Sequence, residues 1–578
     1  MSREVGVEAR VGTLAELQAA GQLRGKLGSH PVVVFWHEDR PWAIEDRCPH
    51  MGFPLHQGTV EAGLVTCHWH HARFDLESGC TLDPFADDAQ AFDVDVVDGD
   101  IVVRARAGED AVEHHHRRLR DGLEDGLTLV IAKSVLGLLD EDVAAADIVR
   151  EGVRFGTEYR AAGWGAGLTV LVAMANLVPD LEHEDRVLAL VHGLAFVSRD
   201  TRNHPPRFAL AGLGRGHDPD RLSSWYRRFT DTRAADAAER VLQTALAEPG
   251  PLAEVEQMMF AAVTDHVFLD GGHTIDFTNK AFEALAHVGA DAAPSVLPTL
   301  VRQTARASRS EEESSWRYPH DLAVLAGDAE RRLTDALGAN GGNGGFDALA
   351  GLAAELLAEH PQEVVDALVG AAEAGATPEQ LGRAVAYAAA LRITRFHTGN
   401  DFGDWDTVHH AFTSANALHH ALERNPTPEL ARGLVHGAFR VYLDRFLNVP
   451  AARLPTATTG ALEDLAECWE AQGMVDQAGA LTYGYLQGGG DPAKVVSALA
   501  HALLREDAEF HWFQVLEAAV RQFHVWPAGS EEGALVLTGL ARFLAAHTPT
   551  RREVSRVVDI ATRLRRGEDL YIDVYAPG

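Results

Sequence analysis

Residues 48–70 read CPHMGFPLHQGTVEAGLVTCHWH and contain two pairs of side chains suited to binding a transition metal. The first pair is Cys48 and His50, and the second is Cys67 and His70. Thiolates and imidazoles are preferred ligands of iron and zinc. Because residues 51–66 separate the two pairs, we expect each pair to lie on its own loop and both loops to close over one metal centre.

Short segments rich in β-branched and aromatic residues surround this stretch, at residues 31–35, 63–66, 72–75, 92–96 and 101–103. Residues 92–96 alternate apolar and acidic side chains, which is typical of a strand with one face in solvent. The dipeptide Asp98-Gly99 follows and favours a two-residue type I′ hairpin turn. We therefore predict that residues 1–106 form a small all-β domain with antiparallel strands.

The Cys-x-His and Cys-x-x-His pairs within this β pattern resemble the ligand motif of the Rieske [2Fe-2S] family. In that family two cysteines bind one iron, two histidines bind the other, and the neutral imidazoles raise the reduction potential. The resemblance covers about residues 30–105. It implies that a [2Fe-2S] cluster is held by Cys48, His50, Cys67 and His70. A zinc site, or a core without a metal, is the alternative interpretation.

Two features depart from the family pattern. His71 stands where the family usually has glycine, and it adds a titratable group beside the second pair. Phe53 and Trp69 occupy the positions that form an additional loop disulfide in Rieske proteins of respiratory complexes, which implies the ferredoxin or oxygenase branch. The remaining cysteines, Cys80 and Cys468, lie outside the motif and are expected to be buried thiols.

After residue 115 the sequence changes to Ala- and Leu-rich helical periodicity, and two motifs recur there in the same order. Arg154-Phe155-x-Thr157 returns as Arg395-Phe396-x-Thr398. Leu190-Val-His-Gly193 returns as Leu434-Val-His-Gly437. Self-similarity of this kind is typical of a duplicated structural unit.

A glycine-rich stretch at residues 338–345 lies between the two copies, as a flexible linker does. We therefore predict a multidomain fold in which the β domain is followed by a large all-α region. That region consists of two related helical modules, at 115–337 and 346–568, joined by the linker at 338–345. A solenoid of helical hairpins, whose neighbours look alike because all bury Ala and Leu, is the alternative.

Acidic residues outnumber basic residues by 84 to 51, which gives a formal net charge of −33. Such a field repels phosphate backbones and anionic lipids, so the sequence predicts no nucleic-acid partner and no membrane partner. The N-terminus lacks the cationic start and apolar core of a secretory signal, and four cysteines do not form a disulfide framework. We therefore expect a cytoplasmic protein in a reducing compartment.

A cluster carries electrons singly and does not transform a substrate, so the helical region has to supply the electron acceptor. In ring-hydroxylating Rieske oxygenases this acceptor is an iron held by an Asp-x-x-His-x(3–4)-His pattern. Asp270-Gly-Gly-His273 and Asp406-Thr-Val-His409 begin such a pattern, but no second histidine follows at the required spacing. The sequence therefore does not predict an ordinary ring-hydroxylating subunit.

Three histidine segments resemble elements of the questin oxidase-like family: His192-Gly, His410-Ala-Phe-Thr-Ser414 and His436-Gly-Ala-Phe-Arg440. That family comprises helical, flavin-independent oxygenases of polyketide aromatic rings. Its iron is non-haem and is bound by histidines and, in some members, by a CO2-modified lysine. The resemblance implies a mono- or dinuclear non-haem iron whose candidate ligands are His192, His266, His273, Lys280, His410 and His436.

Structural roles are the alternatives for these residues. Each helical histidine is alternatively a hydrogen-bonded core residue, and Lys280 alternatively pairs with Asp276 one helical turn away. The Asn-His-x-x-x-His helix of the questin oxidase-like family has no counterpart around Tyr159–Trp164, so the number of ligands stays open.

The preferred hypothesis is a Rieske oxidoreductase in which the cluster passes electrons to the histidine-rich iron. The reaction is then an O2-dependent oxidation of an apolar or aromatic, polyketide-like small molecule. No dinucleotide fingerprint follows a strand, so a separate reductase or ferredoxin is the expected electron donor. The alternatives are a redox sensor or electron carrier whose helical repeats dock a partner, and a helical enzyme without a second metal. Catalytic residues are not assigned, and a homo-oligomer is compatible with the sequence.

Overall fold

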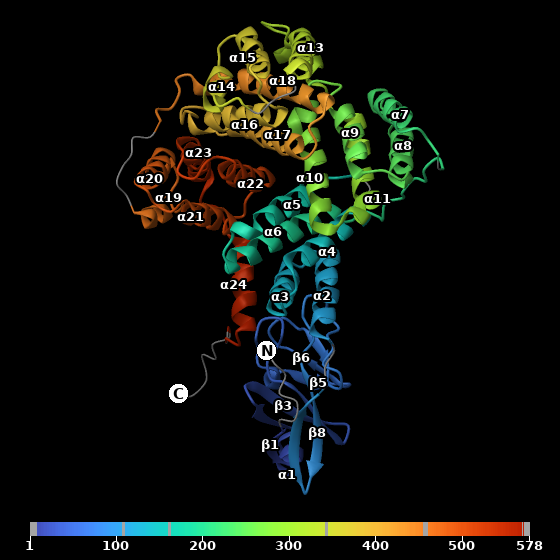
Figure 1. The fold of residues 1–578 in the computed structure, drawn as a ribbon. Helices are drawn as coiled ribbons and strands as arrows, with labels where there is room; N and C mark the ends of the chain where they lie inside the picture. The colour runs from blue at the N-terminus through green and yellow to red at the C-terminus, as the bar shows by residue number, and fades with distance from the viewer. Residues whose placement is uncertain are drawn as a thin grey trace. The chain divides into compact units, whose positions relative to one another are not determined.

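The computed structural model describes residues 8–106, 110–159, 163–214, 216–340, 345–454, 461–568 and 570. The chain divides into two compact units, whose elements are labelled in Figure 1. One unit combines Met1–Ala144 with Glu553–Gly578, and the other is Ala145–Arg552. Both ends of the sequence therefore contribute to the first unit.

The N-terminal β domain consists of two antiparallel sheets. The larger sheet has the strand order β1-β9-β8-β4-β3-β2, and the smaller has the order β5-β6-β7. This arrangement confirms the small all-β domain that the sequence predicts. Helix α1 (Leu14–Ala20) follows the first strand, and the strands are β1 (Glu8–Thr13), β2 (Gln22–Leu27), β3 (His30–His37), β4 (Arg40–Glu45), β5 (Thr59–Glu61), β6 (Leu64–Thr66), β7 (Arg73–Asp75), β8 (Ala91–Val97) and β9 (Asp100–Ala105).

The side chains of β3 alternate between two separate cores. Val33 belongs to a core that also contains Cys48 and Cys67. Val32 belongs to the second core, which is lined by other strands of the larger sheet and by α1. Because successive side chains of a strand point to opposite faces, the larger sheet separates these cores, and one of them buries the two cysteines.

The hairpin between β8 and β9 has the turn that the sequence predicts. Val97 pairs with Asp100 across the two strands, so only Asp98 and Gly99 remain in the loop. Both residues have positive φ, 51° and 88°. Two successive left-handed residues are the requirement of a type I′ turn, and the predicted Asp-Gly turn is therefore confirmed.

Three helices in the described residues complete the first unit: α2 (Ala111–Asp125), α3 (Thr128–Asp140) and α24 (Glu553–Arg565). The Asp110 side chain caps α2 by accepting a hydrogen bond from the Val112 backbone N–H. Helix α3 packs against both α2 and α24. Figure 1 shows α24, coloured red, beside α3.

Within the described residues, the second unit has helices and connecting loops but no strand, which confirms the predicted all-α region. Among the described helices, none combines the length and the apolar character needed to cross a membrane. The unit contains α4 (Ala145–Glu158), α5 (Ala166–Leu177), α6 (His183–Thr201), α7 (Pro219–Asp231), α8 (Ala235–Ala247), α9 (Leu252–Val263), α10 (His273–Val288), α11 (Ala293–Val296), α12 (Val301–Arg306), α13 (Leu322–Asn340), α14 (Leu349–Glu355), α15 (Pro361–Glu373), α16 (Pro378–Thr394), α17 (Asp404–Arg424), α18 (Pro428–Leu443), α19 (Leu465–Cys468), α20 (Val475–Gln487), α21 (Pro492–Leu504), α22 (Phe510–His524) and α23 (Glu531–His547).

Helix α17 is a core element of this unit and packs against α10, α16, α18 and α22. From residue 408 to residue 422 its side chains are buried, with the half-buried His410 as the exception. A helix covered on all sides is normally apolar, because unpaired polar groups are costly to bury. Four histidines nevertheless lie in this stretch, which points to a function for the helix: His409, His410, His419 and His420.

The two Leu-Val-His-Gly segments both lie inside helices, α6 and α18, and both histidines are buried. Helix α13 extends to Asn340, so the predicted linker begins within a helix. Residues 341–344 of that linker, and residues 160–162 near Trp164, lie outside the described residues. The duplication of the helical modules stays a prediction.

Candidate metal centres

Two loops of the β domain carry the predicted cluster ligands and contain the same hydrogen-bonded turn. In the first loop, after β4, the Cys48 N–H donates to the carbonyl five residues later (2.7 Å), and the Gly52 N–H donates to the Cys48 carbonyl (2.8 Å). In the second loop, between β6 and β7, Cys67 and His71 form the corresponding bonds at 2.8 and 2.9 Å. The two loops are therefore built alike, with one cysteine at the start of each turn.

The fourth residue after each cysteine has a left-handed backbone. Gly52 has a φ of 81°, and His71 has a φ of 62°. Glycine adopts this conformation without the steric conflict that a Cβ atom causes. The turn therefore explains the family's usual glycine at this position, and His71 occupies it without losing the hydrogen bond that closes the loop.

The four predicted cluster ligands converge at these loops. Cys48 and Cys67 are each 1% exposed, and the ring centroids of His50 and His70 lie 4.7 Å apart. A hydrogen bond from the Cys48 thiol lowers the pKa of Cys67 to about 6. Burial lowers the pKa of His50 to about 4, and its Nδ1 is buried without a hydrogen-bond partner. Two thiols, one of them favoured as thiolate, and two imidazoles fit the donor set of a Rieske cluster.

The two cysteines outside the motif differ in exposure. Cys468 is buried, as expected, but Cys80 is exposed, which corrects the prediction of a buried thiol. Cys80 lies in the surface turn after β7, where its carbonyl accepts a hydrogen bond from the Asp75 N–H at 3.0 Å. The backbone of this residue is fixed by the turn while its side chain faces solvent.

A second group of metal-binding side chains lies in the helical unit, where His273, His410 and His511 converge from α10, α17 and α22. One ring nitrogen of each lies within 4.8 Å of the others. The Nε2 atoms of His410 and His511 are 3.1 Å apart. The ring centroid of His273 lies 4.8 Å from that of His410 and 5.2 Å from that of His511. We call these three residues the histidine triad.

A tight glycine turn brings His273 into the triad. The short 3-10 segment Leu269–Gly272 ends where His273 begins α10, and Gly272 has a φ of 97°. A Cβ atom on Gly272 would lie 2.8 Å from side-chain carbons of Phe268 and of Ser414. Only glycine therefore lets the start of α10 approach α17 this closely.

The triad imidazoles are neutral at physiological pH. Burial lowers the pKa of His410 to about 2 and that of His511 to about 4, and it also lowers the pKa of His273. His511 and His273 further lower the pKa of His410, and His273 further lowers the pKa of His511. Neutral rings offer lone pairs, so the three side chains are suited to binding one metal ion.

His409 lies directly beside the triad. Its ring centroid is 4.3 Å from that of His511 and 4.5 Å from that of His410. Both ring nitrogens are buried without a hydrogen-bond partner, and Nδ1 lies 3.8 Å from a carboxylate oxygen of Asp406. Burying a ring nitrogen without a hydrogen-bond partner costs free energy of folding, unless a bound ion or molecule contacts it. This observation fits a metal ion among these rings.

The structure brings two of the predicted ligands of the second metal, His273 and His410, together with a third that the sequence did not suggest. His511 stands in Phe510-His511-Trp512, which matches no metal-binding motif. Its partners are more than one hundred residues away in the sequence, as shown by the separation of 101 between His410 and His511. Its only local signal is an isolated histidine at the start of a helix.

Three other predicted ligands have different partners. His192 lies against the Leu504 carbonyl, with Nε2 at 2.8 Å from the oxygen. His266 lies between two carboxylates, at 2.7 Å from Glu311 and 3.0 Å from Asp231. His436 lies 2.9 Å from Glu330 through its Nε2. The structure does not place these residues in the triad.

Lys280 is bound by two glutamates. Its Nζ donates to Glu283 and to Glu517, each at 2.8 Å, and the residue is 1% exposed. Although burial opposes protonation, the two carboxylates raise the pKa of Lys280. A protonated amine has no lone pair for a metal or for CO2. The ion-pair partners of Lys280 are Glu283 and Glu517, whereas the alternative interpretation of the sequence predicted a pair with Asp276.

A small cavity lies next to the triad. Gly272 and Ser414 line it, and the Ser414 hydroxyl donates to the His410 carbonyl at 2.7 Å. Most of its lining is apolar, and the polar lining residues are Thr264, Ser414 and His436. The apolar lining residues are Val263, Phe268, Leu269, Ile275 and Leu418.

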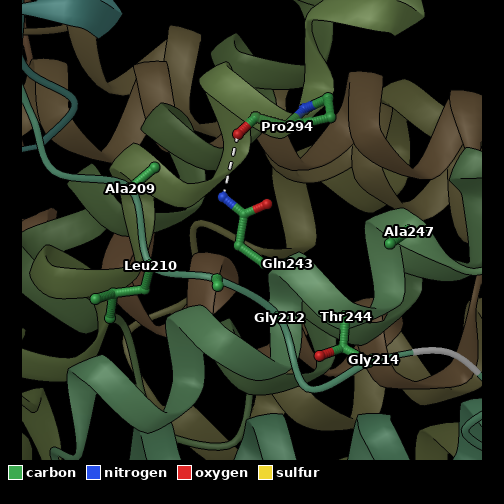
Figure 2. A pocket seen from close by; sticks show the side chains of 9 residues that line it. Ala209, Leu210, Gly212, Gly214, Gln243, Thr244, Ala247 and Pro294 are labelled. Atoms are coloured by element: carbon green, nitrogen blue, oxygen red, sulfur yellow. Dashed lines mark hydrogen bonds between the residues drawn. The ribbon is translucent and has the colours of Figure 1, made fainter.

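A larger cavity of about 630 Å³ lies elsewhere in the unit and is shown in Figure 2. It is lined by the segment 209–214, by helix α8 and by Pro294, whose carbonyl accepts a hydrogen bond from Gln243 at 3.3 Å. Among the described residues that line it, none is titratable or metal-binding. The described lining of this cavity therefore offers no side chain for metal binding or proton transfer, in contrast to the histidine triad.

Comparisons with known proteins concern the N-terminal domain. The family model described as "Rieske [2Fe-2S] domain" matches residues 8–93, and the helical region has no family assignment. Apoptosis-inducing factor 3 of Homo sapiens is 32% identical over 100 residues, which are 17% of this chain and 16% of that protein. A 4beta-methylsterol monooxygenase of Methylococcus capsulatus is 51% identical over 71 residues, which are 10% of this chain and 19% of that protein.

Among solved structures, the ferredoxin of carbazole 1,9a-dioxygenase from Nocardioides aromaticivorans IC177 is 27% identical, with a TM-score of 0.17. That match covers 18% of this chain and all of the ferredoxin. The chain spans less than a fifth of the length of the two curated relatives. The duplicated turns, the convergent thiols and imidazoles, and the family match lead to one conclusion: residues 8–93 are a Rieske [2Fe-2S] domain, an electron-transfer module.

Proposed function

We propose that this protein is a Rieske oxygenase with a separate, helical metal site. Cys48, His50, Cys67 and His70 hold the [2Fe-2S] cluster, and His273, His410 and His511 hold a non-haem iron. The reaction is the O2-dependent oxidation of an apolar or aromatic small molecule, with electrons from an external reductase or ferredoxin. The observation that carries the proposal is the convergence of three neutral, largely buried imidazoles in a chain that also has a Rieske domain.

The donor set supports an open metal site. Three imidazoles suit a first-row transition metal and leave coordination positions for other molecules. When bound, such an iron supplies O2 activation and accepts the electrons that a one-electron carrier provides. The match to a monooxygenase over part of the N-terminal domain supports the pairing of this Rieske domain with oxygen chemistry.

Gln514 sets the tautomer of His511. The His511 Nδ1 lies 3.1 Å from the Gln514 Oε1, and the Gln514 amide nitrogen donates to the carboxylate of Asp276. Because an amide oxygen only accepts, Nδ1 of His511 carries the proton. Nε2 therefore keeps its lone pair and faces the other triad residues, which is the role of outer hydrogen bonds in metal sites.

The cavity beside the triad has a volume of about 20 Å³, which is room for about one water molecule and not for an organic substrate. The substrate class in the proposal therefore rests on the resemblance of the histidine segments to the questin oxidase-like family. Figure 1 shows the triad helices α10, α17 and α22 within the second unit.

Iron counting combined with EPR spectroscopy tests the proposal on the purified full chain. We expect more than the two irons per chain that a [2Fe-2S] cluster accounts for. The surplus is lost in His410→Ala and His511→Ala, while the rhombic signal of the reduced cluster persists. His320→Ala, which changes an exposed histidine, serves as the control and keeps the surplus. Two irons per chain, with no iron signal besides that of the cluster, would contradict the proposal and favour an electron carrier.

A further inference from the structure

A lysine from outside the Rieske domain contacts the first cluster loop. The Nζ atom of Lys133 donates to the His50 carbonyl at 3.1 Å and also donates to the Pro49 carbonyl. Lys133 lies in α3, beyond the residues 8–93 that match the family. It is one of four lysines in the chain, and it is partly buried in a mostly apolar helix.

The helices of the first unit hold the cluster loops from several sides. Arg118 of α2 donates to the carbonyls of Pro84 and Ala86, in the loop that places Phe85 against His50. Arg47 donates to the Leu564 carbonyl at 3.2 Å, at the end of α24. Lys133 therefore belongs to a packed arrangement, because α3 contacts both of these helices.

The Lys133 side chain ends in an amine that donates hydrogen bonds to two successive backbone carbonyls of the first cluster loop. Several N–H groups donated from one nitrogen are the hydrogen-bonding pattern of a lysine ammonium group. A charge at a partly buried position acts more strongly on its neighbours than a charge in water.

Reduction of a Rieske cluster changes its charge. With two thiolates and two neutral imidazoles, the oxidised cluster has no net charge. One electron from a reductase converts one ferric iron to ferrous and leaves a negative charge, and no bond forms or breaks. A fixed ammonium beside the ligand loop therefore stabilises the reduced state more than the oxidised state.

We propose that Lys133 is a positioning and redox-tuning residue: its ammonium holds the loop of Cys48 and His50 and raises the midpoint potential of the cluster. A helix outside the Rieske domain thereby adjusts the potential of the electron carrier. The proposal rests on the cluster assignment alone and not on the iron of the histidine triad.

Redox titration of the full chain, followed by EPR of the reduced cluster, tests this role. Lys133→Met and Lys133→Gln remove the charge, whereas Lys133→Arg keeps it. We expect a lower midpoint potential in the Met and Gln variants and a value near that of the wild type in the Arg variant. Lys26→Met removes the same charge from an exposed position and serves as the control.

Ionic strength separates a local effect from a general one. The shift in Lys133→Met is expected to persist at high salt, because partly buried charges are weakly screened, whereas any shift in Lys26→Met disappears. An unchanged midpoint in Lys133→Met, or an equal shift in Lys26→Met, would overturn the proposal. Iron content is measured on the same samples. Loss of the cluster in both neutral variants would also overturn the tuning role, because Lys133 would then serve only assembly.

Discussion

The two candidate metal sites of this chain are built in opposite ways. In the Rieske domain, the four ligands lie within residues 48–70, on two loops with the same hydrogen-bonded turn. In the helical unit, the three triad histidines come from helices that are distant in the sequence and meet only through packing. The spacing of residues along the sequence is therefore enough to predict the ligands of the first site. The ligands of the second site depend on how the helices of the whole unit pack.

Among the variants that test the difference between the two sites, Cys67→Ser is expected to have the largest effect. A neutral hydroxyl does not replace the thiolate, so the cluster is lost together with its visible absorption and its EPR signal. The helical unit does not depend on this loop, so its helical circular dichroism and its surplus iron remain. Retention of the rhombic signal in this variant would contradict the ligand assignment.

A smaller effect is expected for Gln514→Leu in the helical unit. The substitution removes the acceptor that fixes the tautomer of His511 and leaves its Nδ1 without a partner. Loss of such an outer hydrogen bond weakens metal binding by roughly 10- to 100-fold. Titration of iron into the metal-depleted protein measures this change. Gln522→Leu removes a buried amide of the same helix that contacts Asn416 and His419 instead of the triad, and it serves as the matched control. Equal affinity in wild type and Gln514→Leu would show that His511 needs no such support.

His192→Phe tests whether a buried helical histidine outside the triad is structural. Burial lowers the native pKa of His192 to about 4, whereas an unfolded histidine titrates near 6.5. The unfolded state therefore binds more protons between these values, and the stability of the protein falls as the pH falls through this window. Phenylalanine removes this dependence.

Urea unfolding at pH 7 and pH 5 measures the difference. The loss of stability between these pH values is expected to be about 2 kcal/mol smaller in His192→Phe than in the wild type. The surplus iron is retained, because His192 bonds the Leu504 carbonyl and lies outside the triad. Loss of the surplus iron in this variant would instead place His192 among the ligands.

The smallest effect is expected for Gly99→Ala in the β8–β9 hairpin. A Cβ at this position meets no atom within 4 Å, so only the positive φ of 88° opposes the substitution. The expected cost is about 1 kcal/mol in the free energy of unfolding, measured with urea. Neither metal centre changes, and Asp98→Gly, at the other left-handed position, is the control that is not destabilised.

The sequence was sufficient to predict the β domain and its cluster ligands, because the sequence patterns that indicate them are local. The alternating strand at residues 92–96, the Asp98-Gly99 turn and the paired ligands all depend on neighbours along the chain. His511 was not predicted because its role depends on packing between α10, α17 and α22. Lys280 was proposed as a ligand since it shares a helix with His273, but Glu517, on another helix, binds it.

Helix α24 has a consequence for biosynthesis. Arg47, beside Cys48, contacts the carbonyl of Leu564, which is 517 residues further along the chain. At ordinary rates of translation these residues leave the ribosome on the order of half a minute to two minutes apart. The first cluster loop is therefore synthesised long before this packing partner. A chain whose translation stops before α24 carries the loop without the contact between Arg47 and Leu564.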